Sequence, residues 1–322
     1  MRGVPHQMSP YSLSMLRTTT RRRFLAELTT TGAVAATGSS AMAQSSAKGG
    51  EDALFDISLA QWSLHRSIRA GTVDNLEFAA YTRDSFDIAA VEYVNQFFAD
   101  KATDFDYLTE MKTRAADAGV RSLLIMVDGE GALADADERR RGEAIANHHK
   151  WIVAARFLGC HSIRVNAAGS GDRNEQMLRA AESLVALAEF GDQYEIDVIV
   201  ENHGGLSSDG EWLAGVMKQA NHPGVGTLPD FGNFHIGGGK WYDRYQGVSE
   251  LMPYAKAVSA KSHAFDAQGQ ETKTDFLRMM TIVLDSGYRG HVGIEYEGGG
   301  GLEPEGIRLT RDLLLRVRDE LS

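Results

Sequence analysis

The sequence predicts an α/β protein that folds as a single (β/α)₈ barrel. Three observations favour this fold: short β-branched apolar runs alternate with longer helical patterns, the runs begin about 30 to 40 residues apart, and there are eight of them. Strand–helix units of this length form parallel sheets, and eight of them can close a sheet into a barrel. A doubly wound open sheet is the competing interpretation, but no GxGxxG motif follows the first run.

The predicted strands are short apolar runs that are rich in β-branched residues, as expected for buried strands. Among the connecting segments, residues 103–119, 174–194 and 274–288 have apolar residues at helical spacing, and the first and third contain a glycine at or near the end, where a helix C-cap is expected. The strands, in order, are expected at residues 55–62, 87–94, 121–127, 161–167, 197–202, 225–231, 257–263 and 291–297.

The composition favours a small-molecule enzyme over a nucleic-acid-binding protein. The chain has 44 acidic against 33 basic residues and a net charge of −11, which argues against a polyanionic partner. Cys160 is the only cysteine, so the chain can form neither an internal disulfide nor a thiolate zinc cluster. A small polar or neutral substrate suits this composition better than nucleic acid, and the oligomeric state stays open, a homo-oligomer included.

The first 43 residues are expected to be a removable export signal. Arg21, Arg22 and Arg23 precede Phe-Leu, a weakly apolar stretch and an Ala-Met-Ala cleavage pattern at residues 41–43. This arrangement resembles a twin-arginine signal and predicts a periplasmic or exported protein; the alternative is a chance basic patch on a disordered tail. Residues 44–52 would then be a linker, and residues 53–322 the catalytic barrel.

Removal of this segment would make the protein more acidic. Residues 1–43 contain five Arg and one Glu, so the net charge would change from −11 to −15. No other apolar run reaches the roughly 20 residues that a membrane-spanning helix needs. We therefore expect no membrane span in the mature chain.

Ionisable residues follow the apolar runs of four consecutive predicted strands. Glu201, Asp230, His263 and Glu295 lie where the fifth to eighth strands end. In (β/α)₈ barrels the catalytic residues lie at the C-terminal ends of the strands. Burial of one lone charge costs several kcal/mol, whereas three carboxylates and an imidazole around a divalent cation offset one another. For any one residue a salt bridge explains its position equally well, but the four together favour a metal site.

The type of ligand limits the metal. Carboxylates with one imidazole suit a hard to borderline divalent ion, with Mn²⁺ favoured and Mg²⁺, Co²⁺ or Zn²⁺ as alternatives. In an extended strand alternate residues share a face, so Glu201 and His203 point to the same side. The same spacing places Lys261 beside His263.

The sequence around these residues resembles a known family. The segments IVEN, LPDFGNF, AKSHAFD and GIEYEG, which contain Glu201, Asp230, His263 and Glu295, are similar to those of the xylose isomerase-like TIM barrels. This sugar phosphate isomerase/epimerase superfamily includes ketose 3-epimerases and inosose dehydratases. The resemblance covers about residues 54–320. It implies that the four residues bind the metal and that Glu201 and Glu295 move a proton on either face of the substrate.

The chain departs from the epimerases at two positions. They carry a His three residues after the metal-binding Asp, where this chain has Asn233 with His235 two residues further on. They also carry an Arg six residues after the ligand His, where this chain has Gly269. We expect Asn233 and His235 to contact the substrate, and the two departures weigh against a 3-epimerase activity.

Other polar and aromatic residues can complete the site. Lys261 can stabilise a developing enolate, and His203 can act as a proton carrier beside the metal. Trp241 follows a glycine-rich stretch predicted to be a mobile loop, where Trp241 or Tyr242 can stack on a sugar. Hydroxyl-binding candidates on the remaining strands are Gln61, Glu92, Asn95, Asp128, Arg164 and Asn166.

The predicted reaction is metal-assisted proton abstraction beside the carbonyl of a sugar, through an enediolate. Glu201 or His203 would take the proton, and Glu295 or His203 would return it, which gives epimerisation or aldose–ketose isomerisation. Loss of a leaving group before the proton returns would make the protein a lyase or dehydratase on keto-sugars or 3-keto-glycosides. A non-catalytic sugar-binding barrel is the alternative from another class, and a multi-metal phosphodiesterase is disfavoured by the acidic charge.

Overall fold

Strands and helices alternate throughout the described part of the chain, which is residues 53–299 and 303–322 of a computed structural model. Within these residues eight strands form one parallel sheet in the order β6-β5-β4-β3-β2-β1-β10-β9. The predicted export signal and the whole of the predicted linker lie outside the described residues. The strands of this sheet are β1 (Asp56–Ala60), β2 (Ala90–Val94), β3 (Arg121–Met126), β4 (Ser162–Val165), β5 (Asp197–Glu201), β6 (Val225–Leu228), β9 (Val258–Ser262) and β10 (His291–Tyr296).

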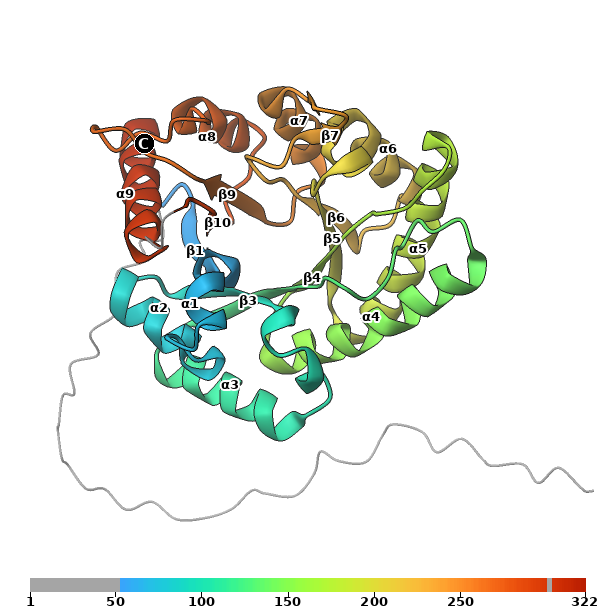
Figure 1. The fold of residues 1–322 in the computed structure, drawn as a ribbon, viewed down its shortest axis with the longest axis horizontal. Helices are drawn as coiled ribbons and strands as arrows, with labels where there is room; N and C mark the ends of the chain where they lie inside the picture. The colour runs from blue at the N-terminus through green and yellow to red at the C-terminus, as the bar shows by residue number, and fades with distance from the viewer. Residues whose placement is uncertain (1–52, 300–302) are drawn as a thin grey trace, which may run out of the picture. The chain divides into compact units, whose positions relative to one another are not determined.

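Helices surround the sheet on its outer side (Figure 1). Most start at an aspartate whose side chain caps the first turn, as Asp104, Asp137 and Asp172 do. Among the described residues no helix is both long enough and apolar enough to cross a membrane. The helices are α1 (His65–Arg69), α2 (Phe78–Phe86), α3 (Phe105–Asp117), α4 (Glu138–Leu158), α5 (Arg173–Gly191), α6 (Gly210–Ala220), α7 (Arg244–Leu251), α8 (Phe276–Asp285) and α9 (Glu303–Leu321).

The sheet curls until its two outer strands, β6 and β9, come together. Lys256 N donates to Thr227 O at 3.0 Å, and Ser259 N donates to Pro229 O at 2.9 Å. One isolated parallel bridge joins Asp230 to Ser259, and another joins Thr227 to Ala255. The chain that follows β6 therefore continues alongside β9, and the C-terminal ends of the strands meet around one mouth.

Two hydrophobic clusters pack on the two faces of the curled sheet. The larger lies between the sheet and the helices and includes the fully buried Trp151 and Trp212. The smaller fills the inside with Leu124, Ile199 and Leu228 from β3, β5 and β6. Because successive residues of a strand alternate faces, β1, β2, β3, β5 and β6 each supply residues to both clusters. The inner cluster leaves room for polar side chains at the strand ends.

A short antiparallel hairpin, β7 (His235–Gly237) and β8 (Lys240–Trp241), follows β6. The sequence predicts a mobile loop here. Gly237, Gly238 and Gly239 all have positive φ, a backbone conformation that glycine adopts readily, so the glycine run forms the turn of the hairpin.

Candidate metal centre

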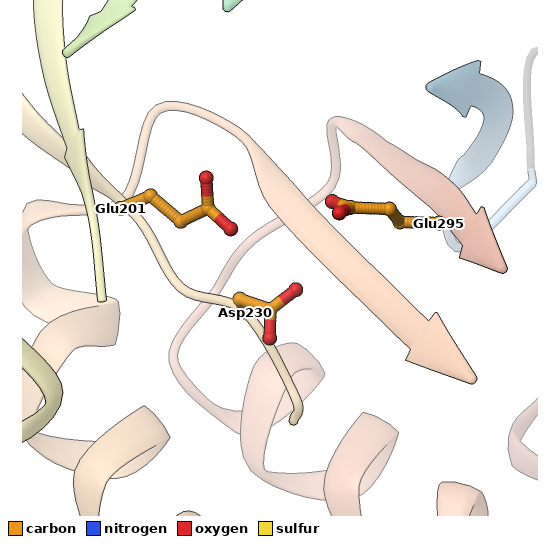
Figure 2. A group of neighbouring side chains, drawn as sticks. All are labelled: Glu201, Asp230 and Glu295. Carbon is orange, nitrogen blue, oxygen red and sulfur yellow. The ribbon is translucent and has the colours of Figure 1, made fainter. Parts of the chain in front are cut away.

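Three carboxylates converge at the C-terminal ends of the strands (Figure 2). Glu201 is the last residue of β5, Glu295 lies one residue before the end of β10, and Asp230 lies two residues after β6. One oxygen from each lies within 4.8 Å of the others, and all three side chains are buried. Figure 2 shows that the carboxyl groups approach a shared space from different sides. We call these three residues the carboxylate triad.

The triad is electrostatically crowded. Burial raises the pKa of Glu201 to about 7, helped by the nearby charge of Glu295 and opposed by Arg164. Burial likewise raises the pKa of Asp230 to about 7, with contributions from Glu295 and Glu201. A carboxylate without compensating charge is costly inside a protein, so this arrangement favours a bound cation.

Asp230 is held by hydrogen bonds to its backbone and side chain. Asn202, the residue after β5, accepts from Asp230 N at 2.7 Å and donates to Asp230 O at 3.0 Å. Ser259 Oγ donates to Asp230 Oδ2 at 2.7 Å and lies 3.1 Å from Glu295 Oε2. Asn202 and Ser259 therefore fix the third carboxylate relative to the two strands that carry the others.

Arg164 on β4 links the triad to the neighbouring strand ends. Its guanidinium lies 2.9 Å from Glu201 Oε2 and 2.8 Å from Asp128 Oδ1, and the residue is only 4% exposed. Although burial opposes ionisation of Asp128, Arg164 holds the pKa of Asp128 at about 2. The contact between Arg164 Nε and Glu201 Oε2 lacks hydrogen-bond geometry, so this buried oxygen has no hydrogen-bond donor.

Lys261 on β9 lies on the other side of the triad. It is the register partner of Glu295 on β10. Its Nζ lies 3.0 Å from Glu295, 3.2 Å from Glu297 and 3.9 Å from Asp230. Burial opposes the charge, but these carboxylates raise the pKa of Lys261 well above its ordinary value. The prediction that Lys261 faces the interior agrees with this position.

The donor set fits a divalent cation. When all are ionised, the triad together with Asp128 and Glu297 supplies five negative charges, and Arg164 and Lys261 supply two positive ones. Three negative charges remain to be balanced, and Glu201 Oε2, which has no hydrogen-bond donor although Arg164 Nε lies 2.9 Å away, is available as a ligand atom. Carboxylate oxygens are the ligands of Mg²⁺ and Mn²⁺ and are also found at Zn²⁺.

The two predicted histidines lie near the triad but outside it. His263 follows β9, is partly buried, and its backbone N lies 3.2 Å from Glu271 Oε1. It is not part of the group formed by the triad. His203 is exposed after β5. The fourth-ligand role of His263 and the proton-carrier role of His203 stay predictions.

The four predicted substrate-binding residues fall into two groups. Asn233 donates to Glu201 Oε1 at 3.0 Å, and Asn166 donates to Asp128 Oδ1 at 2.6 Å, so both belong to the network around the triad. His235 and Trp241 pair across the β7–β8 hairpin with their rings 5.2 Å apart, and Trp241 is 62% exposed. Substrate contact by these four residues stays a prediction.

Comparison with known proteins identifies the family. Residues 83–316 match the family model of the xylose isomerase-like TIM barrel. The chain belongs to this family. It is the family that the sequence around the four predicted ligands resembles. No curated protein matches the chain.

Solved structures of similar fold cover most of this xylose isomerase-like chain. The 3-keto-D-glucoside 4-epimerase YcjR from E. coli shares 14% identity over 81% of this chain and 99% of its own, with a TM-score of 0.64. A xylose isomerase-like TIM barrel protein from Mycobacterium smegmatis in complex with magnesium shares 15% over 83% and 98%, with a TM-score of 0.62. The IOLI protein with a zinc atom shares 12% over 83% and 99%, at 0.63. At these identities the likeness concerns the fold.

Proposed function

We propose that this chain is a divalent-metal-dependent sugar isomerase or epimerase built on a closed (β/α)₈ barrel. The observation that carries the proposal is the carboxylate triad, because three buried acidic side chains at the mouth have no structural purpose that apolar residues would not serve better. The backbone bonds between β6 and β9 support closure of the barrel.

Glu201, Asp230 and Glu295 would hold the ion, with His263 as the fourth ligand. When bound, the ion supplies Lewis acidity, which polarises a carbonyl and makes the neighbouring C–H more acidic. Mn²⁺ is the favoured ion for this ligand set, with Mg²⁺, Co²⁺ and Zn²⁺ as alternatives. The magnesium and zinc in the structures of similar fold support a divalent ion without selecting among these.

The residues around the triad supply the proton transfer. Glu201 or His203 removes the proton beside the carbonyl, and Glu295 or His203 returns it to the opposite face or to the adjacent carbon. Glu201 and Glu295 lie on β5 and β10, which are not neighbours in the sheet, so they can act from different sides of a sugar. The Lys261 ammonium, buried at the same mouth, stabilises the negative charge of the enediolate.

A lyase acting on keto-sugars or 3-keto-glycosides is the second candidate. It is favoured by Asn233, which donates to Glu201 at a position where epimerases present a substrate-binding His, and by Gly269, which has no side chain to act as their Arg does. In this reaction Glu201 or His203 removes the same proton, and the leaving group departs before any proton returns. A sugar-binding barrel without catalysis is the remaining candidate.

We also propose that the protein is exported by the twin-arginine route. The sequence of residues 20–43 supports this location, and an extracytoplasmic enzyme would meet free or oxidised sugars rather than phosphorylated ones. The prediction is checked by N-terminal sequencing of the protein from the periplasm, which should begin at Gln44.

Deuterium exchange tests the function. Metal-loaded protein is incubated in D₂O with ketoses and 3-keto-glycosides, and the products are followed by NMR and mass spectrometry. We expect deuterium at the carbon beside the carbonyl, and a loss of at least about 1,000-fold in rate for E201Q but not for E189Q, which changes an exposed helical residue. Release of water or an aglycone would identify the lyase instead.

Absence of exchange with every substrate would remove the enzyme proposal and leave the binding barrel. Metal analysis separates these cases further, since E201Q and D230N should lose the stoichiometric ion while E189Q keeps it. Full metal content in both site variants would contradict the assignment of the triad.

A further inference from the structure

Lys261 is placed between two sets of carboxylates. On one side its Nζ contacts Glu295 at 3.0 Å and lies 3.9 Å from Asp230, both members of the triad. On the other side it contacts Glu297 at 3.2 Å. Glu297 is not in the triad, and its side chain is 31% exposed at the mouth. The Lys261 ammonium therefore lies near two carboxylates of the triad and has a third carboxylate partner, Glu297, outside the triad.

Glu297 is itself anchored on its far side. Trp62 Nε1 donates to Glu297 Oε1 at 2.5 Å, and the other oxygen, Oε2, faces Lys261. The Trp62 indole is stacked on His65 with ring centroids 4.8 Å apart, and the Arg69 guanidinium lies 4.8 Å above the indole. Glu297 therefore offers the ammonium a carboxylate oxygen at a fixed position.

We propose that Lys261 competes with the metal for the triad and that Glu297 is the positioning residue that draws the ammonium aside when the metal binds. The inference rests on the metal site proposed above. Neither Lys261 nor Glu297 is one of the predicted metal ligands, and in this proposal neither of them binds the metal.

The physical basis is repulsion between two cations that use the same ligands. Glu295 and Asp230 cannot both coordinate a divalent ion at full strength while the Lys261 ammonium stays 3.0 and 3.9 Å from them. The Lys side chain has a flexible stem, so its Nζ can pivot while the stem stays buried. Because Glu297 is already at 3.2 Å, a small pivot keeps the ammonium paired and near the substrate.

A double-mutant cycle on metal affinity tests the proposal. The mature chain is stripped with a chelator, and Mn²⁺ is titrated against the unaltered protein, K261M, E297Q and K261M/E297Q by calorimetry or by competition with a fluorescent chelator. We expect K261M to bind Mn²⁺ about 10-fold more tightly, because methionine keeps the stem but removes the charge. E297Q should bind about 10-fold more weakly, because the ammonium then has only the triad as partner.

The double variant decides between a positioning role and direct ligation. If Glu297 acts through Lys261, K261M/E297Q should bind like K261M within about twofold. The proposal is overturned if E297Q leaves the affinity unchanged, or if E297Q weakens binding equally in the K261M background. E305Q, which removes an exposed charge from α9, should match the unaltered protein.

The same titration separates this proposal from the metal site itself. Stoichiometric binding with no effect of E297Q would overturn the role of Glu297 alone. Absence of binding in both the unaltered protein and K261M would overturn the metal site and the proposed function with it. Circular dichroism of each metal-free variant verifies folding, and K261Q replaces K261M in the cycle if K261M is poorly folded.

Discussion

Glu92 on β2 is a buried carboxyl outside the triad. It is 1% exposed and accepts a hydrogen bond from Ser58 Oγ at 2.7 Å, while its Oε2 has no partner. It lines a cavity of about 180 Å³ that also contacts His161 and His291, which lie at the N-terminal ends of β4 and β10. Burial, with the charges of Glu295 and Glu201, raises the pKa of Glu92 to about 7 despite the bond from Ser58.

This shifted pKa links the stability of the protein to pH. A carboxyl whose pKa is higher in the folded state than its ordinary 4.5 stabilises the fold fully below pH 4.5, and this contribution is lost as the pH rises through about 7. E92Q mimics the protonated form and can still accept from Ser58. Between pH 5 and pH 8 the unaltered protein should therefore lose up to about 3 kcal/mol of unfolding free energy relative to E92Q.

Urea denaturation of the metal-loaded proteins at pH 5, 6, 7 and 8 measures this difference. E182Q, a change at an exposed position of α5, should follow the unaltered protein at each pH. If the unfolding free energies of E92Q and the unaltered protein change equally with pH, ionisation of Glu92 is not the cause of the pH dependence.

Three of the four predicted ligands were predictable as a group, but the side-chain contacts around them were not. The rule that chemistry gathers at strand ends predicted the positions of Glu201, Asp230 and Glu295, and the structure brings these three together. The period-two pattern shows which face a side chain occupies, but not which residue of another strand it meets. The contacts of Arg164 with Glu201 and of Glu297 with Lys261 depend on the register between neighbouring strands, β4 with β5 and β9 with β10, and could not be predicted.

At the scale of elements, all eight predicted strands are confirmed with boundaries that differ by three residues or fewer. Residues 291–297 contain β10 (His291–Tyr296), and residues 225–231 contain β6 (Val225–Leu228) with the bend that carries Asp230. Helices predicted at 103–119, 174–194 and 274–288 correspond to α3, α5 and α8. The β7–β8 hairpin was missed because its glycine-rich sequence lacks an apolar strand pattern, so local backbone pairing alone defines it.

One helix contact fixes the segment that follows β6. Gly247 on α7 packs directly on the ring of Phe234, so a Cβ at position 247 would overlap this fully buried ring. G247A should therefore destabilise the fold by about 1 to 3 kcal/mol, although alanine is the better helix former. Because Phe234 follows Asn233, the substitution should also weaken metal binding by moving the neighbouring Asp230 loop. Thermal unfolding and Mn²⁺ titration provide the two measurements.

Gly142 on α4 provides a matched control. It is an exposed helical glycine, and nothing lies within 4 Å of the place that a Cβ would occupy, so G142A should stabilise the protein by about 0.5 to 1 kcal/mol. The double variant G247A/F234L, which shortens the ring side chain, should recover part of the stability lost in G247A. Equal stabilisation by G247A and G142A would mean that the Phe234 contact is not tight.

At the scale of the whole described domain, the metal centre lies at the seam of the sheet. At this seam, isolated bridges join β6 and the residues after it to β9 and the residues before it. The other neighbouring strands are paired as continuous parts of the sheet. The triad takes one ligand from β5, one from the chain after β6 and one from β10, on either side of this seam. A bound ion would therefore join the two edges of the sheet as well as serve catalysis.

Metal removal should consequently lower stability and loosen the seam in particular. A ligand that binds the folded state alone stabilises it by about 2.7 kcal/mol at a concentration 100 times its Kd. The metal-loaded protein should thus melt at a higher temperature than the chelator-treated protein, and D230N should show no such difference. Hydrogen exchange should speed up after chelation at the amides of Lys256 and Ser259, which bond across the seam, and stay unchanged at Val198 on β5. Uniform acceleration of all three would indicate that the ion stabilises the domain globally and does not act as a link across the seam.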